Sequence, residues 1–188
     1  MINRVLHVIA RVNVGGTASF LYSLNQFESN DWEQLIATGF VQSPEIEDTR
    51  ISQMPVVRIP SLGRRIRFWS DLKARQEINR LVKEYSPNVI VSHTFKAGLL
   101  VRTLLTQIPI IHIYHGHLLN DPEFTQFEKR VIVQVERALA KRASMLVTTG
   151  RKVAQELQEA GIRHNVWRNI HPGISPLREL ERDIAISN

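Results

Sequence analysis

The sequence predicts an α/β fold, with a doubly wound parallel sheet of six to seven strands and helices on both faces. Two observations carry this prediction. Short runs of aliphatic and β-branched residues alternate along the chain with longer segments whose apolar residues recur every three to four positions. The short runs are almost continuously apolar, which is typical of strands buried on both faces of a parallel sheet.

Seven segments are expected to form the strands. The run from Arg4 to Ala10 (RVLHVIA) is the clearest, because it is apolar, branched and followed by a glycine-containing turn. Pro109 opens another, at a position where a strand tolerates a residue without an N–H group. In chain order, the expected strands span residues 4–10, 35–41, 55–59, 89–92, 109–114, 145–148 and 165–170.

Helices are expected between these strands. Thr17 is expected to cap the first helix, because its hydroxyl can accept a hydrogen bond from a free N–H group, and Gly161 is expected to end the last. In chain order, the helices are expected to begin near residue 17 and to span 69–85, 95–106, 124–142 and 151–160. In the fourth, an apolar residue at every fourth position predicts the face that packs on the sheet: Phe127, Val131, Val135 and Leu139.

The length of 188 residues fits one domain with one substantial core. Residues 1–176 are expected to form that domain, and residues 177–188 a polar tail or the start of an interdomain linker. No apolar run approaches the roughly 18 residues that span a membrane, and the N-terminus does not resemble a secretory signal, so a cytoplasmic location is expected. The absence of cysteine excludes a disulfide scaffold, a zinc–thiolate site and a cysteine nucleophile.

Positive charge is concentrated in the second part of the chain. Residues 1–62 carry 4 basic and 6 acidic side chains, whereas residues 63–188 carry 20 and 12. The excess begins at Arg64, Arg65 and Arg67, and it has two interpretations: a solvated surface, or attraction to an anionic partner such as a nucleotide or a phospholipid membrane. No densely basic run or nucleic-acid-binding motif is present, which argues against nucleic acid as a partner.

Polar, small and titratable residues follow several of the expected strands. Because ligands of such folds bind beyond the carboxyl ends of the strands, these residues are expected to meet at one rim of the sheet. They are Gly15 and Gly16 after the first strand, His93, Thr94 and Lys96 after the fourth, His115, Gly116 and His117 after the fifth, and Thr148, Thr149 and Gly150 after the sixth.

Members of this set have a functional and a structural interpretation. The pair Gly15 and Gly16 can present N–H groups to a phosphate or form a tight turn; the third glycine of a dinucleotide fingerprint and the lysine of a P-loop are missing. His115 can exchange a proton or hydrogen-bond a hydroxyl, or it can satisfy loop backbone groups. Lys96 can reach a phosphate or a sugar hydroxyl, or it can lie exposed on a helix.

Other candidate chemistries are less well supported. Glu45, Glu47 and Asp48 follow the second expected strand, where they can bind sugar hydroxyls or form a solvated loop. The chain has 7 histidines, but no His-x-x-x-His pair on a helix is joined by a third ligand, so no metal site is expected. Neither a Ser/His/Asp triad nor a glycosidase carboxylate pair can be assigned.

Several segments together resemble the N-terminal domain of the family-4 retaining glycosyltransferases. Each motif is short, but they occur in the family's order over roughly residues 4–176. The segments are 11–18 (RVNVGGTA), 59–65 (IPSLGRR), 92–100 (SHTFKAGLL), 114–117 (YHGH), 136–143 (ERALAKRA) with Thr148 and Thr149, and 169–175 (NIHPGIS).

This resemblance implies the GT-B arrangement, in which two Rossmann-like domains face a cleft. The N-terminal domain mainly receives the acceptor, and the C-terminal domain mainly binds the nucleotide-sugar donor. The chain would be the Rossmann-like, acceptor-side part of a hexosyltransferase, expected to be inactive without a C-terminal donor-binding domain. The acceptor would be a glycan or a lipid carrier of the cell envelope, and the basic loop would suit a peripheral contact with the inner face of an anionic membrane.

The resemblance also implies roles for individual residues. Gly15, Gly16 and Thr17 would lie at the donor diphosphate, and His115 would be the catalytic residue that hydrogen-bonds the donor sugar near the reacting carbon. The acceptor side would be lined by His93, Thr94, Lys96, His117, Arg64 and Arg65. No metal or other cofactor is implied, because N–H groups at Gly16 and Thr17 would stabilise the charge that develops on the leaving diphosphate.

Two other functions stay open at this point. The chain could be a non-catalytic truncated or split module that binds an acceptor or a partner subunit. It could also be a nucleotide-dependent oxidoreductase or epimerase on a similar fold, against which the missing third glycine argues.

Overall fold

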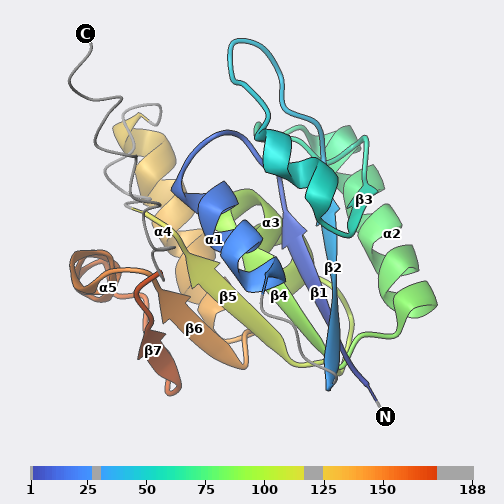
Figure 1. The fold of residues 1–188 in the computed structure, drawn as a ribbon. Helices are drawn as coiled ribbons and strands as arrows, with labels where there is room; N and C mark the ends of the chain where they lie inside the picture. Colours follow the sequence, from blue (N-terminus) through green and yellow to red (C-terminus); the bar gives the residue numbers. More distant parts are fainter. Residues whose placement is uncertain (1, 27–30, 117–124, 173–188) are drawn as a thin grey trace, which may run out of the picture.

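The computed structural model of the chain describes residues 2–26, 31–116 and 125–172. The strands of this part of the chain form one parallel sheet in the order β3-β2-β1-β4-β5-β6-β7 (Figure 1). They are β1 (Asn3–Ile9), β2 (Trp32–Thr38), β3 (Val56–Arg58), β4 (Val89–His93), β5 (Ile110–Tyr114), β6 (Met145–Thr148) and β7 (Trp167–Asn169). The predicted α/β class with a doubly wound, Rossmann-like sheet is confirmed. The edge strands β3 and β7 are the shortest, with 3 residues each.

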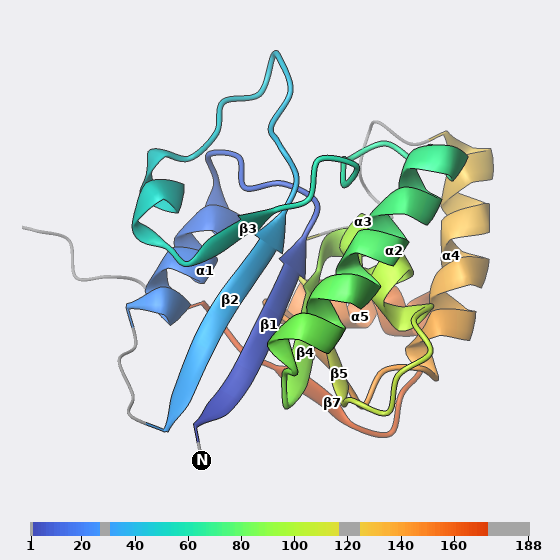
Figure 2. The ribbon, with the colours of Figure 1, turned by 90° about the vertical axis from the view of Figure 1, so that its right-hand side faces the viewer.

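Helices cover both faces of this sheet. They are α1 (Gly16–Asn25), the 3-10 helix η1 (Thr49–Gln53), α2 (Phe68–Tyr85), α3 (Thr94–Arg102), α4 (Gln126–Ala140) and α5 (Arg151–Glu159). Figure 2 shows α1 on one side of the sheet and α2, α3 and α4 on the other. This division follows from right-handed crossovers, because connections that run toward β3 and connections that run toward β7 place their helices on opposite faces.

The central strand β1 contributes to the core on both faces, because successive side chains of a strand point in opposite directions. Leu6 and Val8 pack with α2 and α3, whereas Ile9 packs with α1 and η1. His7 shares the second face with Ile9 and is 4% exposed. A polar side chain is therefore buried in the middle of an otherwise apolar strand.

Two sequence predictions about helices are wrong. Phe127 and Val131 of α4 are 74% and 46% exposed, while Ile132 and Glu136 on a neighbouring face are buried. The helix takes this rotation because Glu136 meets a buried cationic partner, described below. Gly15, not Thr17, is the N-cap of α1, and no side chain caps this helix. Thr17 instead lies within the first turn.

The predicted tail at residues 177–188 lies outside the described residues. Within residues 2–26, 31–116 and 125–172, no helix is long and apolar enough to cross a membrane.

Candidate functional site

Some of the predicted rim residues follow strands at the point where the strand order changes direction. β1 pairs with β2 on one side and with β4 on the other, so the chain builds outward from β1 in one direction and then from β4 in the other. Crevices at such a point, beyond the carboxyl ends of the strands, are where open parallel sheets bind ligands. His93 ends β4, His115 follows β5, and Gly15 and Gly16 follow β1.

Three histidines from neighbouring strands form a hydrogen-bonded row at this point. Nδ1 of His7 lies 2.9 Å from Nε2 of His93, and Nδ1 of His93 lies 2.8 Å from Nε2 of His115. The rings are stacked, with centroids 5.2 Å and 5.1 Å apart. The structure therefore brings together His93 and His115, as predicted, and adds His7, which the sequence analysis did not select.

Helix α1 packs directly over this row. The ring of Phe20 meets His115 edge-on at a centroid distance of 5.0 Å and His93 at 6.3 Å. Phe20 lies one turn after the start of α1, so this contact places the glycine pair near the two histidines. The structure thus packs α1, which begins at the glycine pair, on His93 and His115. The roles assigned to these residues stay predictions.

Burial keeps the histidine row uncharged. Desolvation lowers the pKa of His7 to about 4 and the pKa of His115 to about 4. The pKa of His93 is lowered well below its ordinary value, first by burial and then by the neighbouring His115 and His7. At neutral pH these side chains are therefore neutral imidazoles, which can each donate one hydrogen bond and accept one.

The start of α1 is open to a ligand. Gly15 has a φ of 153°, a backbone conformation that favours glycine, and a Cβ built on Gly15 or Gly16 would meet no atom within 4 Å. The same space exists at Gly116, beside His115. Without a side-chain cap, the first N–H groups of α1 can bind an anion, with help from the helix dipole.

Thr94 is strained at the start of α3. Its φ is 63°, in the left-handed region that β-branched residues rarely adopt. Such strain costs about 1–3 kcal/mol and is concentrated in functional sites. The position next to His93 makes Thr94 a stronger candidate than its residue type alone suggested.

Lys96 takes a structural position that the sequence analysis did not anticipate. Its side chain is 4% exposed, and its ammonium group pairs with a carboxylate oxygen of Asp71 and donates to the carbonyl of Arg65 at 3.0 Å. These contacts tie the basic loop and the first turn of α2 to α3. Lys96 is therefore not exposed on its helix, which was one of the two interpretations of the sequence. Its ammonium group already has protein partners, and its predicted role on the acceptor side stays a prediction.

The remaining predicted site residues are placed less centrally. The side chains of Arg64 and Arg65 are exposed on the loop before α2, and Arg64 lies 3.3 Å from Glu45. His117 lies outside the described residues. The acidic loop is paired with arginines: Glu45 with Arg11, Glu47 with Arg58 and Asp48 with Arg50. Guanidinium groups thus occupy the carboxylates that were considered as sugar ligands, and they lower the pKa of Glu45 and of Asp48.

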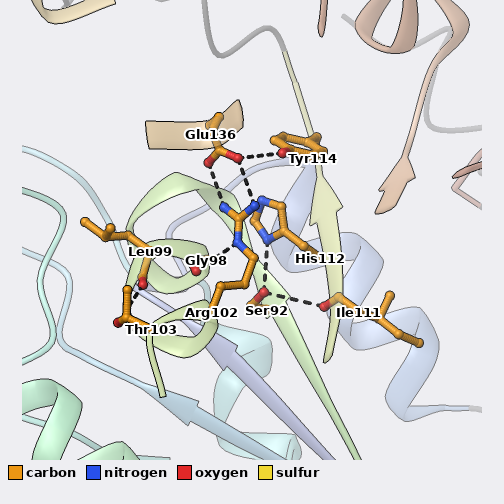
Figure 3. A network of polar contacts seen from close by, with 9 residues as sticks. All are labelled: Ser92, Gly98, Leu99, Arg102, Thr103, Ile111, His112, Tyr114 and Glu136. Carbon is orange, nitrogen blue, oxygen red and sulfur yellow. Dashed lines mark hydrogen bonds and ion pairs between the residues drawn. The ribbon is translucent and has the colours of Figure 1, made fainter. Parts of the chain in front are cut away.

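A second polar network joins α3 and α4 to β5 and was missed from the sequence (Figure 3). Arg102 and Glu136 form a bidentate ion pair with N–O distances of 2.7 and 2.9 Å, and the hydroxyl of Tyr114 donates to Glu136 at 2.6 Å. Nearby, Nδ1 of His112 lies 2.9 Å from the hydroxyl of Ser92. The signal that could have revealed this network is the glutamate on the apolar side of α4.

No metal site emerges from residues 2–26, 31–116 and 125–172, because no group of three or more histidine or acidic side chains there could hold an ion. A separate pocket of about 730 Å³ lies at the amino ends of β6 and β7 and is lined by Lys141, Gln158, Arg163, His164, Asn165 and Trp167. None of the predicted site residues lines this pocket. It lies at the amino ends of the strands, whereas the histidine row lies toward their carboxyl ends.

The chain belongs to the glycosyl transferase 4-like domain family, which matches residues 21–173. No curated protein matches the chain.

Solved structures share the fold at low sequence identity. Sucrose-phosphate synthase from Thermosynechococcus elongatus matches 92% of this chain and 49% of its own, with 15% identity and a TM-score of 0.71. Anabaena HepE in complex with UDP-glucose matches 98% and 50%, with 18% identity and a TM-score of 0.64. A putative UDP-N-acetylglucosamine 2-epimerase from Listeria monocytogenes matches 89% and 44%, with 12% identity and a TM-score of 0.60. The chain therefore spans about half the length of these proteins.

Proposed function

We propose that this chain is the acceptor-side domain of a glycosyltransferase that moves a sugar, with retention, from a nucleotide-sugar donor to a glycan or lipid-linked acceptor. The observation that carries the proposal is the neutral histidine row beside the open N-terminus of α1 at the switch point of the sheet. The family match favours a transferase over an oxidoreductase or an epimerase on a similar fold.

The geometry suits the two charges that such a transfer develops. Positive charge grows on the sugar ring, and negative charge grows on the leaving diphosphate. The N–H groups of Gly16 and Thr17 point out of an uncapped helix and would stabilise the diphosphate. His115 would hydrogen-bond a hydroxyl of the sugar and hold the reacting carbon in place. This division of roles requires no metal ion or other cofactor.

A second domain would supply the rest of the donor site. Support comes from the solved structures, which are about twice as long as this chain. HepE has been solved with UDP and with UDP-glucose, which makes a uridine nucleotide the first donor to test here. The chain by itself would transfer little or no sugar.

The direct test is an assay of transfer from UDP-sugars by the 188-residue chain alone and by the chain joined to a family donor-binding domain. Only the joined enzyme should be active. In that enzyme, His115→Ala should lower kcat by about 100-fold or more while KM changes little, because its contact matters most in the transition state. Lys141→Ala, at the opposite edge of the sheet, is the control. Activity of His115→Ala within about threefold of wild type would remove this residue from the mechanism.

We also propose that the loop before α2 rests on an anionic membrane and so favours a lipid-linked acceptor. Arg64, Arg65 and Arg67 lie here beside exposed apolar side chains of the loop and of the first turn of α2. Ile66, Phe68 and Trp69 are 60%, 72% and 78% exposed. Aromatic rings among arginines match the boundary between lipid headgroups and acyl chains. The loop follows the carboxyl end of β3, so it lies on the same edge of the sheet as the histidine row.

Vesicle sedimentation of the chain tests this surface. Binding should be strong to vesicles containing phosphatidylglycerol, weak to pure phosphatidylcholine and sensitive to salt. Replacing Phe68 and Trp69 by serine should weaken binding about tenfold. Leu105→Ser removes an equally exposed apolar side chain (86%) elsewhere and should have no effect. Equal binding to neutral and anionic vesicles, or no loss in the double variant, would contradict the membrane contact.

A further inference from the structure

The histidine row continues into the protein and ends on a backbone carbonyl. Nε2 of His7 lies 3.0 Å from Oε1 of Gln34, and Nε2 of Gln34 lies 3.0 Å from the carbonyl oxygen of Leu24. A single hydrogen-bonded chain therefore runs from the end of α1 through β2, β1 and β4 to the loop after β5. His7 and His93 are 86 residues apart in the sequence, and His93 and His115 are 22 apart.

The carbonyl sets the direction of every hydrogen bond in this chain. A carbonyl oxygen only accepts, so the amide nitrogen of Gln34 must donate to Leu24 and its amide oxygen must face His7. That oxygen also only accepts, so the proton on His7 is on Nε2. The partners along the row thus assign atoms that heavy-atom positions alone leave ambiguous.

The same logic passes along the neutral imidazoles. With its proton on Nε2, His7 accepts at Nδ1 from Nε2–H of His93. His93 then accepts at Nδ1 from Nε2–H of His115. The last free nitrogen of the row is Nδ1 of His115, which carries no proton and has no hydrogen-bond partner among the described residues. Burial, which lowers the pKa of all three side chains, keeps them in the neutral form that this logic needs.

The row ends at the open side of the site. Buried side-chain nitrogens and oxygens without a partner in the described residues are Nε2 of His112 and Nε1 of Trp167. Nδ1 of His115 is not among them, although it too has no partner in the described residues, and the His115 residue as a whole is only partly buried. Gly116 next to it leaves open space, in which a Cβ would meet no atom within 4 Å.

We infer that Gln34 and His7 are positioning residues that hold His115 in its Nε2–H tautomer, so that the group bound at Nδ1 of His115 must be a hydrogen-bond donor such as a sugar hydroxyl. A phosphate oxygen, which has no proton to donate at neutral pH when fully ionised, is excluded from this position. The statement about the bound group rests on the proposed function, whereas the tautomer does not.

Neither residue would act on a ligand directly. Gln34 lies on β2 and joins His7 to α1, and His7 lies in the interior of β1. Hydrogen bonds in a row polarise one another, so the carbonyl of Leu24 also makes Nδ1 of His115 a better acceptor. Reversing the row would leave the amide of Gln34 with its oxygen against the Leu24 carbonyl oxygen.

Nitrogen-15 NMR of the histidine-labelled 188-residue chain at pH 7, without ligand, tests the inference. For His7, His93 and His115, Nε2 should have the chemical shift of a protonated nitrogen and Nδ1 that of an unprotonated one. A protonated Nδ1 on His115, or a freely exchanging mixture of tautomers, in the wild-type chain would overturn the inference. Because no sugar is present, this result is independent of any failure to detect transfer.

A variant pair tests the role of the anchor. Gln34→Met removes the amide at similar volume, and the tautomer ratio at His115 should move toward an even mixture by at least about fivefold, the effect of one lost hydrogen bond. Gln76→Met, on the exposed side of α2, should leave the ratio unchanged. A folded Gln34→Met chain that keeps the wild-type ratio would show that Gln34 does not set the tautomer. If that variant does not fold, the wild-type spectrum still decides.

Discussion

Arg102 and Glu136 form a bidentate ion pair in which both side chains have 0% exposure. The pair joins α3 to α4 across the face of the sheet, and the Tyr114 hydroxyl on β5 adds a third hydrogen bond. Burial and the neighbouring Glu136 carboxylate raise the pKa of Tyr114, so its hydroxyl stays protonated and donates. The glutamate of the ERALAKRA segment is thus placed in the interior of the domain, where it orients α4.

Glu136→Gln tests how much this ion pair contributes to stability. Removing one charge leaves the Arg102 guanidinium buried without compensation, which should lower the free energy of unfolding by about 3–5 kcal/mol. Urea denaturation measures the change. Glu84→Gln breaks the exposed pair of Arg80 and Glu84 and should cause no measurable loss. If both variants lost the same free energy of unfolding, the buried ion pair would contribute no more to stability than the exposed one.

Gly39 marks a close approach of two backbone segments. A Cβ at this position would lie 1.7 Å from the carbonyl oxygen of Leu62 and 2.8 Å from that of Ala10. Backbone cannot yield as a flexible side chain can, so Gly39→Ala should cost about 3 kcal/mol or more, or prevent folding. Gly63→Ala, whose Cβ would meet nothing within 4 Å, is the matched control. Thermal unfolding of both variants compares them, and similar midpoints would refute the close approach.

Stability should fall as the pH is lowered from about 6.5 toward 4. The pKa of each of four histidines, His7, His93, His112 and His115, is lowered by burial in the folded chain. The unfolded chain then binds more protons in this range, so unfolding becomes easier as pH falls, by up to about 1.4 kcal/mol per pH unit for each histidine.

Urea denaturation at a series of pH values from 7.5 to 4.5 measures this dependence. The arginine-paired carboxylates of Glu45 and Asp48, whose pKa values are lowered, lose their contribution only at more acidic pH, below their ordinary pKa. A free energy of unfolding that stays constant down to pH 5 would contradict the buried, neutral state of the histidine row.

Thr94→Gly tests whether the strained backbone at the start of α3 serves the site. Glycine adopts positive φ without strain, so the variant should be more stable by about 1 kcal/mol. Ser86, at the C-cap of α2, also has a positive φ (51°) and provides the control, since Ser86→Gly should give a similar gain. In the joined enzyme, only Thr94→Gly should reduce transfer. Wild-type transfer by Thr94→Gly would make its strain incidental to the site.

The sequence supported the fold better than the contacts within it. Most strands appeared as short apolar runs, and the observed strands begin and end within a few residues of the expected ones. His93 and His115 could be found because they end or follow strands. His7 could not, because a histidine within RVLHVIA gives no sign that it meets a residue 86 positions away. The burial of Lys96 likewise depends on Asp71, which lies on a different helix.

The exposed face of α4 is a second feature that the sequence did not predict correctly. Spacing by four selected Phe127 and Val131, but an apolar stripe does not reveal its partner, and the rotation of α4 is set by Glu136 and Arg102. The ion pair between these distant segments therefore determines which face of α4 is buried, whereas the periodicity of apolar residues alone predicted the wrong face. Such pairs are visible only when the strands and helices have been placed in three dimensions.

The short edge strands have a consequence for how the chain behaves among its own copies. A parallel sheet exposes unpaired backbone groups at both edges, and long flat edges invite pairing with another molecule. Here each edge strand has only 3 residues, and the Arg58 side chain on β3 is held in an ion pair with Glu47. Edge strands this short present few backbone groups to another copy of the chain, which limits edge-to-edge pairing of sheets.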